Sequence, residues 1–325
     1  MEKERGKVSW IFAKFHKKTT LVPMLEYLLF ALFSGAGQEM LAQVQLQQLP
    51  EIEILNPLSL PQLEAGRVAP KLLASEETAV FAQDISSKKI LLSERVDRAQ
   101  PIASLTKIMT ALMILSDHEL EEEVIVPLAA TKVVGAQIGI YQYERLTVKT
   151  LLQAALIPSA NDAAVALAAW DAGSEEEFAV KMNEKARELG ITTATFFNAT
   201  GLDMWNENTE TWYGNEMSAR DVARMTRFAL QNDFFKETVA QRHFWGTSVG
   251  GEFLHEKKST NQLFDTFLNL SGVKTGYTQL AGQCFVSLGS TVDDHEVLTV
   301  ILGSTDRFGE TKKLLSWVYD SFTWK

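Results

Sequence analysis

The sequence predicts an α+β fold, with a mainly antiparallel sheet built from both chain ends, flanked by helices, and with an inserted helical lobe. Residues 78–97 read as two strands joined by a polar turn, which indicates a hairpin. The apolar pattern between residues 272 and 304 is again typical of strands. Residues 147–231, which lie between these regions, carry helical signals. The strands of the two ends are therefore expected to share one sheet.

The N-terminal segment has the pattern of an export signal. Residues 1–20 carry six basic and two acidic side chains, and an apolar run at 21–33 is followed by small residues. Pro23 and Glu26 interrupt this run, which is short for a membrane span. We therefore predict a signal peptide or an N-terminal membrane anchor at 1–37, and a location at the periplasmic or extracellular face of the cytoplasmic membrane. An amphipathic core helix is the alternative.

The next segment, residues 38–74, is rich in Gln, Leu and Pro without a clean period, and we predict a linker there. The folded domain is expected at 75–325, which is long enough for a large core. The formal net charge of −10 argues against a nucleic-acid partner.

Helices are expected after the first hairpin and at the C-terminus. The segment that begins at Ser104 is apolar almost all round, which is typical of a buried helix. Ser174 and Ser218 each precede an acidic residue three positions later, as in a helix-capping box. An amphipathic helix at 309–322 closes the chain. The helices expected in the lobe are 147–157, 161–173, 174–190 and 218–232.

Several kinds of site are excluded or disfavoured. The single cysteine, Cys284, permits no internal disulfide or cysteine-based zinc site, and its apolar neighbours indicate a buried strand thiol. The chain contains no His-Glu-x-x-His and no phosphate-binding P-loop, and we expect no metal and no cofactor. "GTSVG" at 246–250 matches a nucleophile elbow, but no helical period follows it, so a glycine-rich hairpin turn is preferred.

Ser-x-x-Lys occurs three times, and its context separates the three copies. The copy at 86–89 lies in a polar turn, and the copy at 271–274 lies in a strand, where residues three apart face opposite sides. Only the copy at 104–107 opens an apolar helix, where residues three apart share a face.

This spacing suits nucleophilic catalysis. A serine hydroxyl is a weak nucleophile until a base removes its proton, and Lys107 can be that base for Ser104 only when it is neutral. Burial lowers the pKa of a lysine, and a second cation nearby, such as Lys274, lowers it further. The helix N-terminus under Ser104 favours developing negative charge. The alternative is a side chain whose ammonium reaches water along an apolar surface.

Two further motifs complete a pattern. Ser-x-Asn occurs at 159–161 and 259–261, and Lys-Thr-Gly occurs at 274–276. With the flanks "PIASLTKIMTALMIL", "LLQAALIPSANDAAVALA", "FAVKMNEKARELGITTATFFNATGLD" and "SGVKTGYTQLAGQCFV", the chain resembles the serine-type D-Ala-D-Ala carboxypeptidases, the low-molecular-mass penicillin-binding proteins. The resemblance covers about residues 75–325 and implies a β-lactamase/transpeptidase-like catalytic domain.

The resemblance implies a role for each reactive residue. Ser104 is the expected nucleophile, which forms an acyl-enzyme as the terminal D-alanine leaves, and Lys107 is its general base. Ser159 is expected to relay a proton toward the leaving amine. The backbone N–H groups of Ser104 and Tyr277 are expected to form the oxyanion hole.

The resemblance also implies how substrate is held. Asn161 is expected to hydrogen-bond the substrate amide, Lys274 to supply positive potential and Thr275 to bind the substrate carboxylate. Gly276 belongs to the strand that is expected to line the cleft. Arg307 is expected to bind the free carboxylate, and a surface arginine at a helix start is the alternative. The implied partners are a peptidoglycan stem peptide ending in D-Ala-D-Ala and β-lactam antibiotics as covalent inhibitors, with membrane attachment through the N-terminal segment.

Three alternative functions stay open. A D,D-endopeptidase acting on cross-links uses the same motifs. A class A β-lactamase needs a local Glu-x-x-x-Asn, which does not occur between Ser159 and Lys274. An inactive cell-wall-binding or sensor protein is disfavoured because all the reactive residues are present.

Overall fold

The computed structural model describes residues 59–70 and 77–325. The predicted leader at 1–37 and most of the predicted linker at 38–74 lie outside these ranges. Within them, no helix combines the length and the apolar character that crossing a membrane requires. Export and membrane attachment therefore stay predictions.

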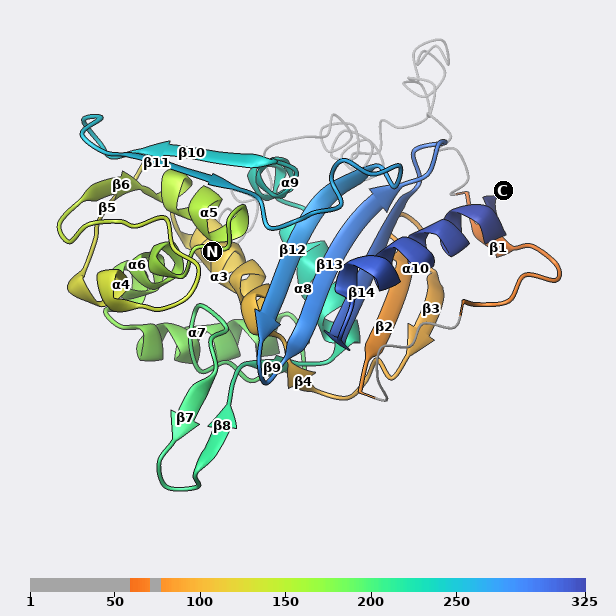
Figure 1. The fold of residues 1–325 in the computed structure, drawn as a ribbon, viewed down its shortest axis with the longest axis horizontal. Helices are drawn as coiled ribbons and strands as arrows, with labels where there is room; N and C mark the ends of the chain where they lie inside the picture. The colour runs from red at the N-terminus through yellow and green to blue at the C-terminus, as the bar shows by residue number, and fades with distance from the viewer. Residues whose placement is uncertain (1–58, 71–76) are drawn as a thin grey trace, which may run out of the picture. The chain divides into compact units, whose positions relative to one another are not determined.

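The centre of the fold is a five-stranded antiparallel sheet in the order β12-β13-β14-β2-β3 (Figure 1). Val300 of β14 pairs with Phe81 of β2, which joins the strands from the two ends of the chain. The predicted sheet is therefore confirmed. The strands are β2 (Ala79–Asp84), β3 (Ile90–Glu94), β12 (Leu270–Thr278), β13 (Gly282–Ser290) and β14 (Glu296–Ser304).

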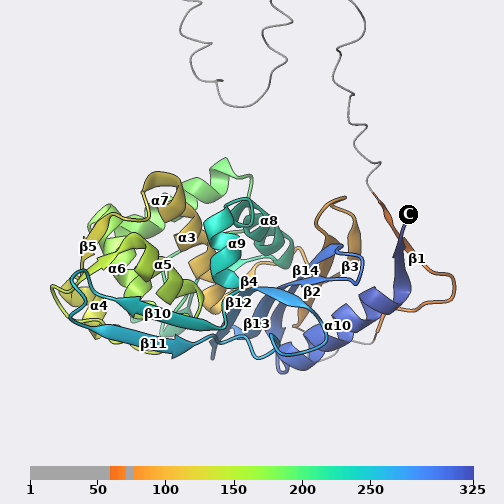
Figure 2. The same ribbon diagram turned by 90° about the horizontal axis from the view of Figure 1, so that it is seen from above.

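Successive side chains along the strands point to opposite faces of the sheet, and a hydrophobic core lies on each face. Helix α10 (Arg307–Ser321) covers one face, and α8 (Ala219–Ala229) covers the other, with α3 (Thr106–Asp117) packed against α8 (Figure 2). Val80 joins the cluster under α10, whereas its neighbour Phe81 joins the larger cluster on the opposite face. This period of two is the pattern that predicted the strands.

The inserted lobe is mainly helical, as predicted. The buried helix begins with a tight turn, η3 (Ala103–Leu105), and continues as α3. Two predicted caps are confirmed, because the hydroxyls of Ser174 and Ser218 accept the backbone N–H three residues later at 3.1 and 3.2 Å. The other helices are α4 (Leu128–Lys132), α5 (Val148–Leu156), α6 (Asn161–Ala172), α7 (Glu175–Glu188) and α9 (Asp233–Val239).

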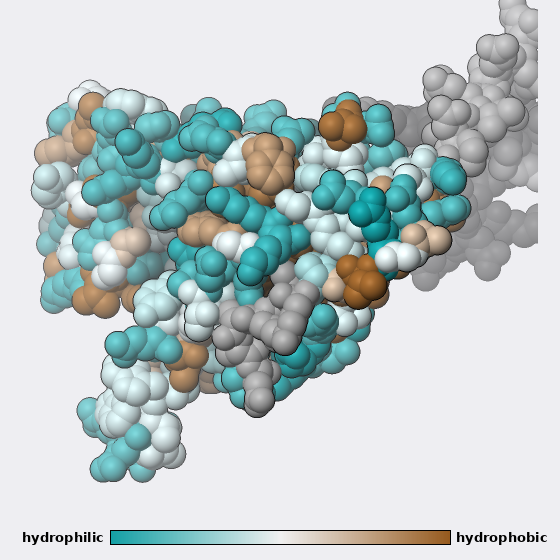
Figure 3. Space-filling view, turned by 45° about the vertical axis from the view of Figure 1, so that its right-hand side comes forward, coloured by the Kyte–Doolittle hydropathy of each residue, from teal (hydrophilic) through white to brown (hydrophobic). Residues whose placement is uncertain are grey.

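Short strand pairs, which the sequence did not predict, interrupt the region read as helical. The ribbon of β7 (Met204–Asn206) and β8 (Thr211–Tyr213), here called the arm, projects from the helical part and has a pale to teal surface (Figures 1 and 3). The prediction for 147–231 is wrong here, because strands of three residues have no readable period. Similar pairs are β4 (Gln100–Pro101) with β9 (Glu216–Met217), and β5 (Glu123–Ile125) with β6 (Arg145–Thr147).

The hairpin interpretation of "GTSVG" is confirmed. Strand β10 (His243–Thr247) pairs antiparallel with β11 (Leu254–Lys258), and residues 248–253 connect them. The segment does not run from a strand into a helix, so Ser248 lacks the setting of a nucleophile elbow.

Part of the predicted linker belongs to the fold. Strand β1 (Pro61–Leu63) pairs antiparallel with the C-terminal strand β15 (Phe322–Trp324). The linker prediction is therefore corrected for these three residues. Their partner lies at the opposite end of the chain, and a local sequence pattern cannot reveal a pairing of that separation.

Candidate active site

Ser104 and Lys107 lie where η3 passes into α3. Ala103, just before the serine, has φ of +48°, a strained conformation for a residue with a Cβ atom. Thr106 Oγ1 donates to Ala103 O at 2.8 Å and holds this turn. The turn places Lys107 Nζ 3.1 Å from Ser104 Oγ, so the two side chains share a face as predicted.

The Lys107 amine has three oxygen neighbours. Its Nζ atom lies 3.1 Å from Ser104 Oγ, 2.7 Å from Asn161 Oδ1 and 2.8 Å from Thr200 O. The last two oxygens can only accept hydrogen bonds, whereas a hydroxyl can also donate. A neutral amine has two hydrogens, which these two acceptors take. Its lone pair is then left facing the hydroxyl of Ser104, as a general base requires.

The surroundings favour the neutral form of this amine. Lys107 has no exposed surface, and burial lowers the pKa of its amine to about 7. The carboxylates of Glu175 and Asp162 oppose this shift. Burial in turn raises the pKa of Glu175, so its charge near Lys107 is also disfavoured. The alternative of a lysine that reaches water is excluded by the burial.

The carbonyl of Thr200 belongs to a loop that the sequence did not identify as part of the site. Asn198 Oδ1 accepts the N–H groups of Thr200 and Gly201 at 3.2 and 2.6 Å, and Asn215 Nδ2 donates to Asn198 O at 2.8 Å. A Cβ atom on Gly201 would lie 1.9 Å from Ala103 O, so only glycine fits against the turn. The stretch "NATGLD" contributed to the family resemblance. The role of Thr200 could not be predicted from it, because every residue type carries a main-chain carbonyl.

Asn161 and Ser159 lie at the start of α6. The backbone N–H of Asn161 donates to Ala136 O at 2.7 Å, and its Nδ2 donates to Val134 O at 2.7 Å. These bonds orient Oδ1 toward Lys107. Ser159, almost buried, has φ of +66°, so the backbone is strained just before the helix.

Strand β12 runs directly past the nucleophile. A Cβ atom on Gly276 would lie 3.1 Å from the Ser104 nitrogen, from Ile102 O and from Ala103 Cβ. The absence of a side chain at Gly276 therefore allows the strand to approach Ser104. Tyr277 follows on the same strand.

The Lys-Thr-Gly motif adds positive charge and a hydroxyl. Lys274 is buried, and burial lowers the pKa of its amine well below the ordinary value, with further lowering by Lys107 and Arg307. Its Nζ atom donates to Thr275 O at 3.0 Å. The hydroxyls of Thr275 and Thr260 lie 2.6 Å apart. The two lysine amines are therefore electrostatically coupled, and the structure shows this coupling in the lowered pKa of Lys274.

Arg307, the first residue of α10, points back to this strand. Its Nη1 donates to Gly276 O at 2.7 Å, while its Nε is buried without a hydrogen-bond partner among the described residues. The guanidinium carbon of Arg307 lies 4.8 Å from the centroid of the Phe308 ring. Arg307 is thus half-buried beside the motif, rather than a surface arginine at a helix start.

The remaining candidates take no part in the Ser104–Lys107 pair, although Cys284 lies opposite Gly276 on the neighbouring strand. Cys284 is buried in β13, and burial raises the pKa of its thiol to about 11, as expected for a strand thiol that does not react. The Ser86–Lys89 copy lies in the turn between β2 and β3. Across 59–70 and 77–325, no group of three or more potential metal-binding side chains occurs.

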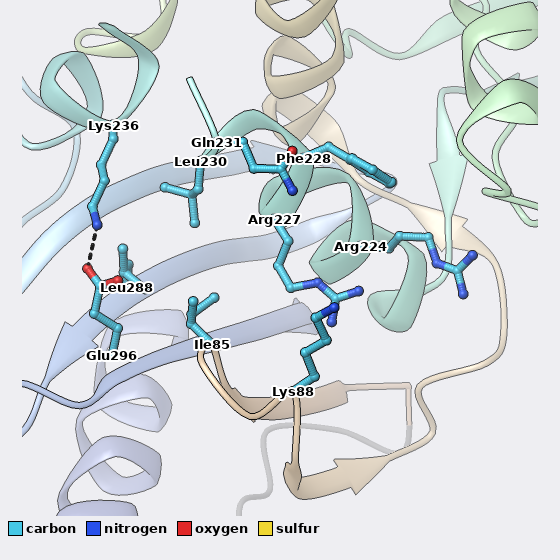
Figure 4. A pocket seen from close by; sticks show the side chains of 10 residues that line it. All are labelled: Ile85, Lys88, Arg224, Arg227, Phe228, Leu230, Gln231, Lys236, Leu288 and Glu296. Carbon is cyan, nitrogen blue, oxygen red and sulfur yellow. Dashed lines mark ion pairs between the residues drawn. The ribbon is translucent and has the colours of Figure 1, made fainter. Parts of the chain in front are cut away.

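A hollow of about 340 Å³ lies away from these residues, between α8, α9 and the sheet (Figure 4). Its charged groups are largely engaged, because Lys236 pairs with Glu296 at 2.8 Å and Arg227 donates to Gln83 Oε1 at 2.6 Å. None of the predicted site residues lines it. The candidate active site is therefore the cluster around Ser104.

Comparisons with known proteins place the chain in a family. A family model described as D-alanyl-D-alanine carboxypeptidase matches residues 67–306. The D-alanyl-D-alanine carboxypeptidase DacF of Bacillus subtilis is 30% identical over 275 residues, which cover 79% of this chain and 65%, just under two thirds, of that protein. A D-alanyl-D-alanine endopeptidase of Escherichia coli is 28% identical over 270 residues, 79% of this chain and 83% of that protein.

Solved structures show the same fold. The crystal structure of a D-alanyl-D-alanine carboxypeptidase from Mycobacterium tuberculosis matches with a TM-score of 0.70 and 25% identity, over 81% of this chain and 99% of that chain. The predicted transpeptidase-like α+β fold is therefore confirmed.

Proposed function

Since the chain belongs to the D-alanyl-D-alanine carboxypeptidase family, we propose that it is a serine hydrolase that removes the terminal D-alanine from peptidoglycan stem peptides. The observation that carries the proposal is the buried Lys107 amine, which lies 3.1 Å from Ser104 Oγ and has two other fixed oxygen neighbours, Asn161 Oδ1 and Thr200 O. In its neutral form, which the lowered pKa of about 7 makes accessible, this amine can take the serine proton.

Acylation begins with attack of Ser104 Oγ on the carbonyl carbon of the penultimate D-alanine. The hydroxyl proton passes to Lys107, and the carbonyl oxygen gains negative charge in the tetrahedral intermediate. The N–H groups of Ser104 and Tyr277 stabilise this oxygen, each donor contributing about 3 kcal/mol in sites of this kind. Collapse breaks the C–N bond, and a proton relayed through Ser159 neutralises the leaving amine of D-alanine.

Hydrolysis then restores the enzyme. A water molecule attacks the acyl ester on Ser104, and Lys107 accepts a proton from the water. Collapse of the second tetrahedral intermediate releases the shortened peptide and returns a proton to the serine. The amine alternates between neutral and protonated forms, which is consistent with its pKa of about 7.

The cationic side of the site suits a peptide with a free C-terminal carboxylate. Lys274 and Arg307 supply positive potential, and Thr275 supplies a hydroxyl that bonds the carboxylate. Asn161 bonds the substrate amide. A β-lactam carries an acylating carbonyl and a carboxylate in a similar arrangement, so we include β-lactams as covalent inhibitors.

The substrate also defines where the protein acts. Peptidoglycan lies outside the cytoplasm, so the proposal requires export, which the predicted leader at 1–37 would provide. Retention of that segment would hold the catalytic domain at the membrane surface.

Mass spectrometry after incubation with benzylpenicillin, together with an assay of D-alanine released from a D-Ala-D-Ala peptide, tests the proposal. We expect one adduct on Ser104 and release of D-alanine, and both should be absent in Ser104→Ala. Equal labelling of wild type and Ser104→Ala would refute the assigned nucleophile. Cleavage of a cross-linked dimer without release of D-alanine would favour the endopeptidase, the activity that names the Escherichia coli relative.

A further inference from the structure

The arm stands beside the far end of the strand that carries the Lys-Thr-Gly motif. Asp203 Oδ2 accepts the backbone N–H of Leu280 at 3.1 Å, which ties the base of the arm to the turn after β12. A hollow of about 310 Å³ opens at this junction, lined by Asp203, Trp212, Gln279 and Leu280. Trp212 is 59% exposed, and its ring lies 5.4 Å from that of Trp205.

The direction of β12 relates this hollow to the proposed reaction. Gly276 packs against Ser104, and Thr275, which is proposed to hold the leaving D-alanine, lies on one side of it. Tyr277 and the turn at 279–281 lie on the other side. A substrate that extends along the strand therefore places its acyl part, the portion that precedes the leaving residue, toward the hollow.

The charge of the arm indicates which side chain fits there. Residues 203–213, the arm and its base, carry three acidic side chains and no basic one. A carboxylate beside an exposed indole face suits an alkylammonium group, which gains both ionic and cation–π attraction. A carboxylate on the ligand would be repelled.

We propose that this hollow is a specificity subsite for the residue immediately before D-Ala-D-Ala, and that it selects a diamino acid through a free side-chain ammonium at Asp203. The proposal rests on the proposed function. The substrate is long enough to reach the hollow. Roughly 5 Å of backbone and 6 Å of side chain separate the attacked carbonyl carbon from the ammonium group of such a residue. Gly276 and Leu280 are four residues apart, at most about 13 Å along a strand.

Three synthetic peptides test the subsite: acetyl-Lys-D-Ala-D-Ala, its ε-acetylated form and the norleucine analogue. We expect kcat/KM for D-alanine release to be about fivefold higher for the free amine, as for a partly exposed ion pair. Asp203→Asn keeps an acceptor for Leu280 and should remove this preference, whereas Asp203→Glu should retain part of it. Trp212→Ala should raise KM for the free-amine peptide.

Trp245 provides a matched control, because it is 58% exposed but lies on β10. Trp245→Ala should leave all three rates unchanged. Equal rates for the three peptides in wild type, or an unchanged preference in Asp203→Asn, would overturn the subsite. Failure to release D-alanine from any peptide would instead overturn the proposed function on which it rests.

Discussion

Replacement of Gly276 by alanine tests how closely β12 must approach the nucleophile. The added methyl group would lie 3.1 Å from three atoms of residues 102–104, one of them the Ser104 nitrogen. Ordinary contacts begin near 3.4 Å, so the strand or the turn must yield by a few tenths of an ångström. Both are held by backbone hydrogen bonds, so the displacement separates the two proposed oxyanion donors.

The expected loss follows from this displacement. A shift of about 1 Å in a reacting group costs roughly 100-fold in rate, so a shift of a few tenths should slow penicillin acylation of Gly276→Ala by about tenfold. The rate of acylation is measured by stopped-flow or quenched mass spectrometry. Thermal unfolding should change little, because the clash is marginal.

Gly214→Ala is the matched control, because its added methyl group would meet no atom closer than 3.4 Å. It should be acylated at the wild-type rate. A Gly276→Ala variant that reacts as fast as wild type would refute the inference that the strand needs a glycine against Ser104.

Other substitutions and reagents probe the remaining groups. Lys107→Arg should slow acylation by at least 1,000-fold, because arginine stays protonated; an active variant, seen by penicillin labelling, would contradict the base assignment. Arg307→Ala should raise KM about tenfold more for peptides with a free C-terminal carboxylate than for their amides, and equal effects would remove its assigned role. Cys284, with a pKa raised to about 11 by burial, should resist iodoacetamide at pH 8 in the folded protein and react after unfolding; rapid native labelling would contradict its burial.

The central sheet and the Ser104–Lys107 pair could be predicted from the sequence, because each depends on the spacing of residue types along the chain. Successive side chains of β2, β13 and β14 point alternately into the two hydrophobic cores on either face of the sheet. This period of two is visible in the sequence, so the sheet could be predicted. The Ser104–Lys107 pair could also be predicted, because residues three apart share a helix face and because Ser-x-Asn and Lys-Thr-Gly accompany the pair in the sequence.

The parts that the sequence did not predict depend on the tertiary fold. Thr200 contributes its main-chain carbonyl to Lys107 from 93 residues away, and any residue type carries that group. Asn198 and Asn215 matter because they hold this loop, and neither has a local signal. The arm and the β1–β15 pair are too short for a period, so only their tertiary partners define them.

The pH dependence of acylation tests most directly whether Lys107 acts as a neutral base. Below its pKa the amine carries a third hydrogen and has no lone pair for the serine proton. The rate of penicillin acylation of Ser104, measured from pH 5 to 9, should therefore fall tenfold per unit at low pH and level off above an inflection near 7. A rate that is constant over this range, or that keeps rising toward the ordinary lysine pKa of about 10.4, would contradict the account.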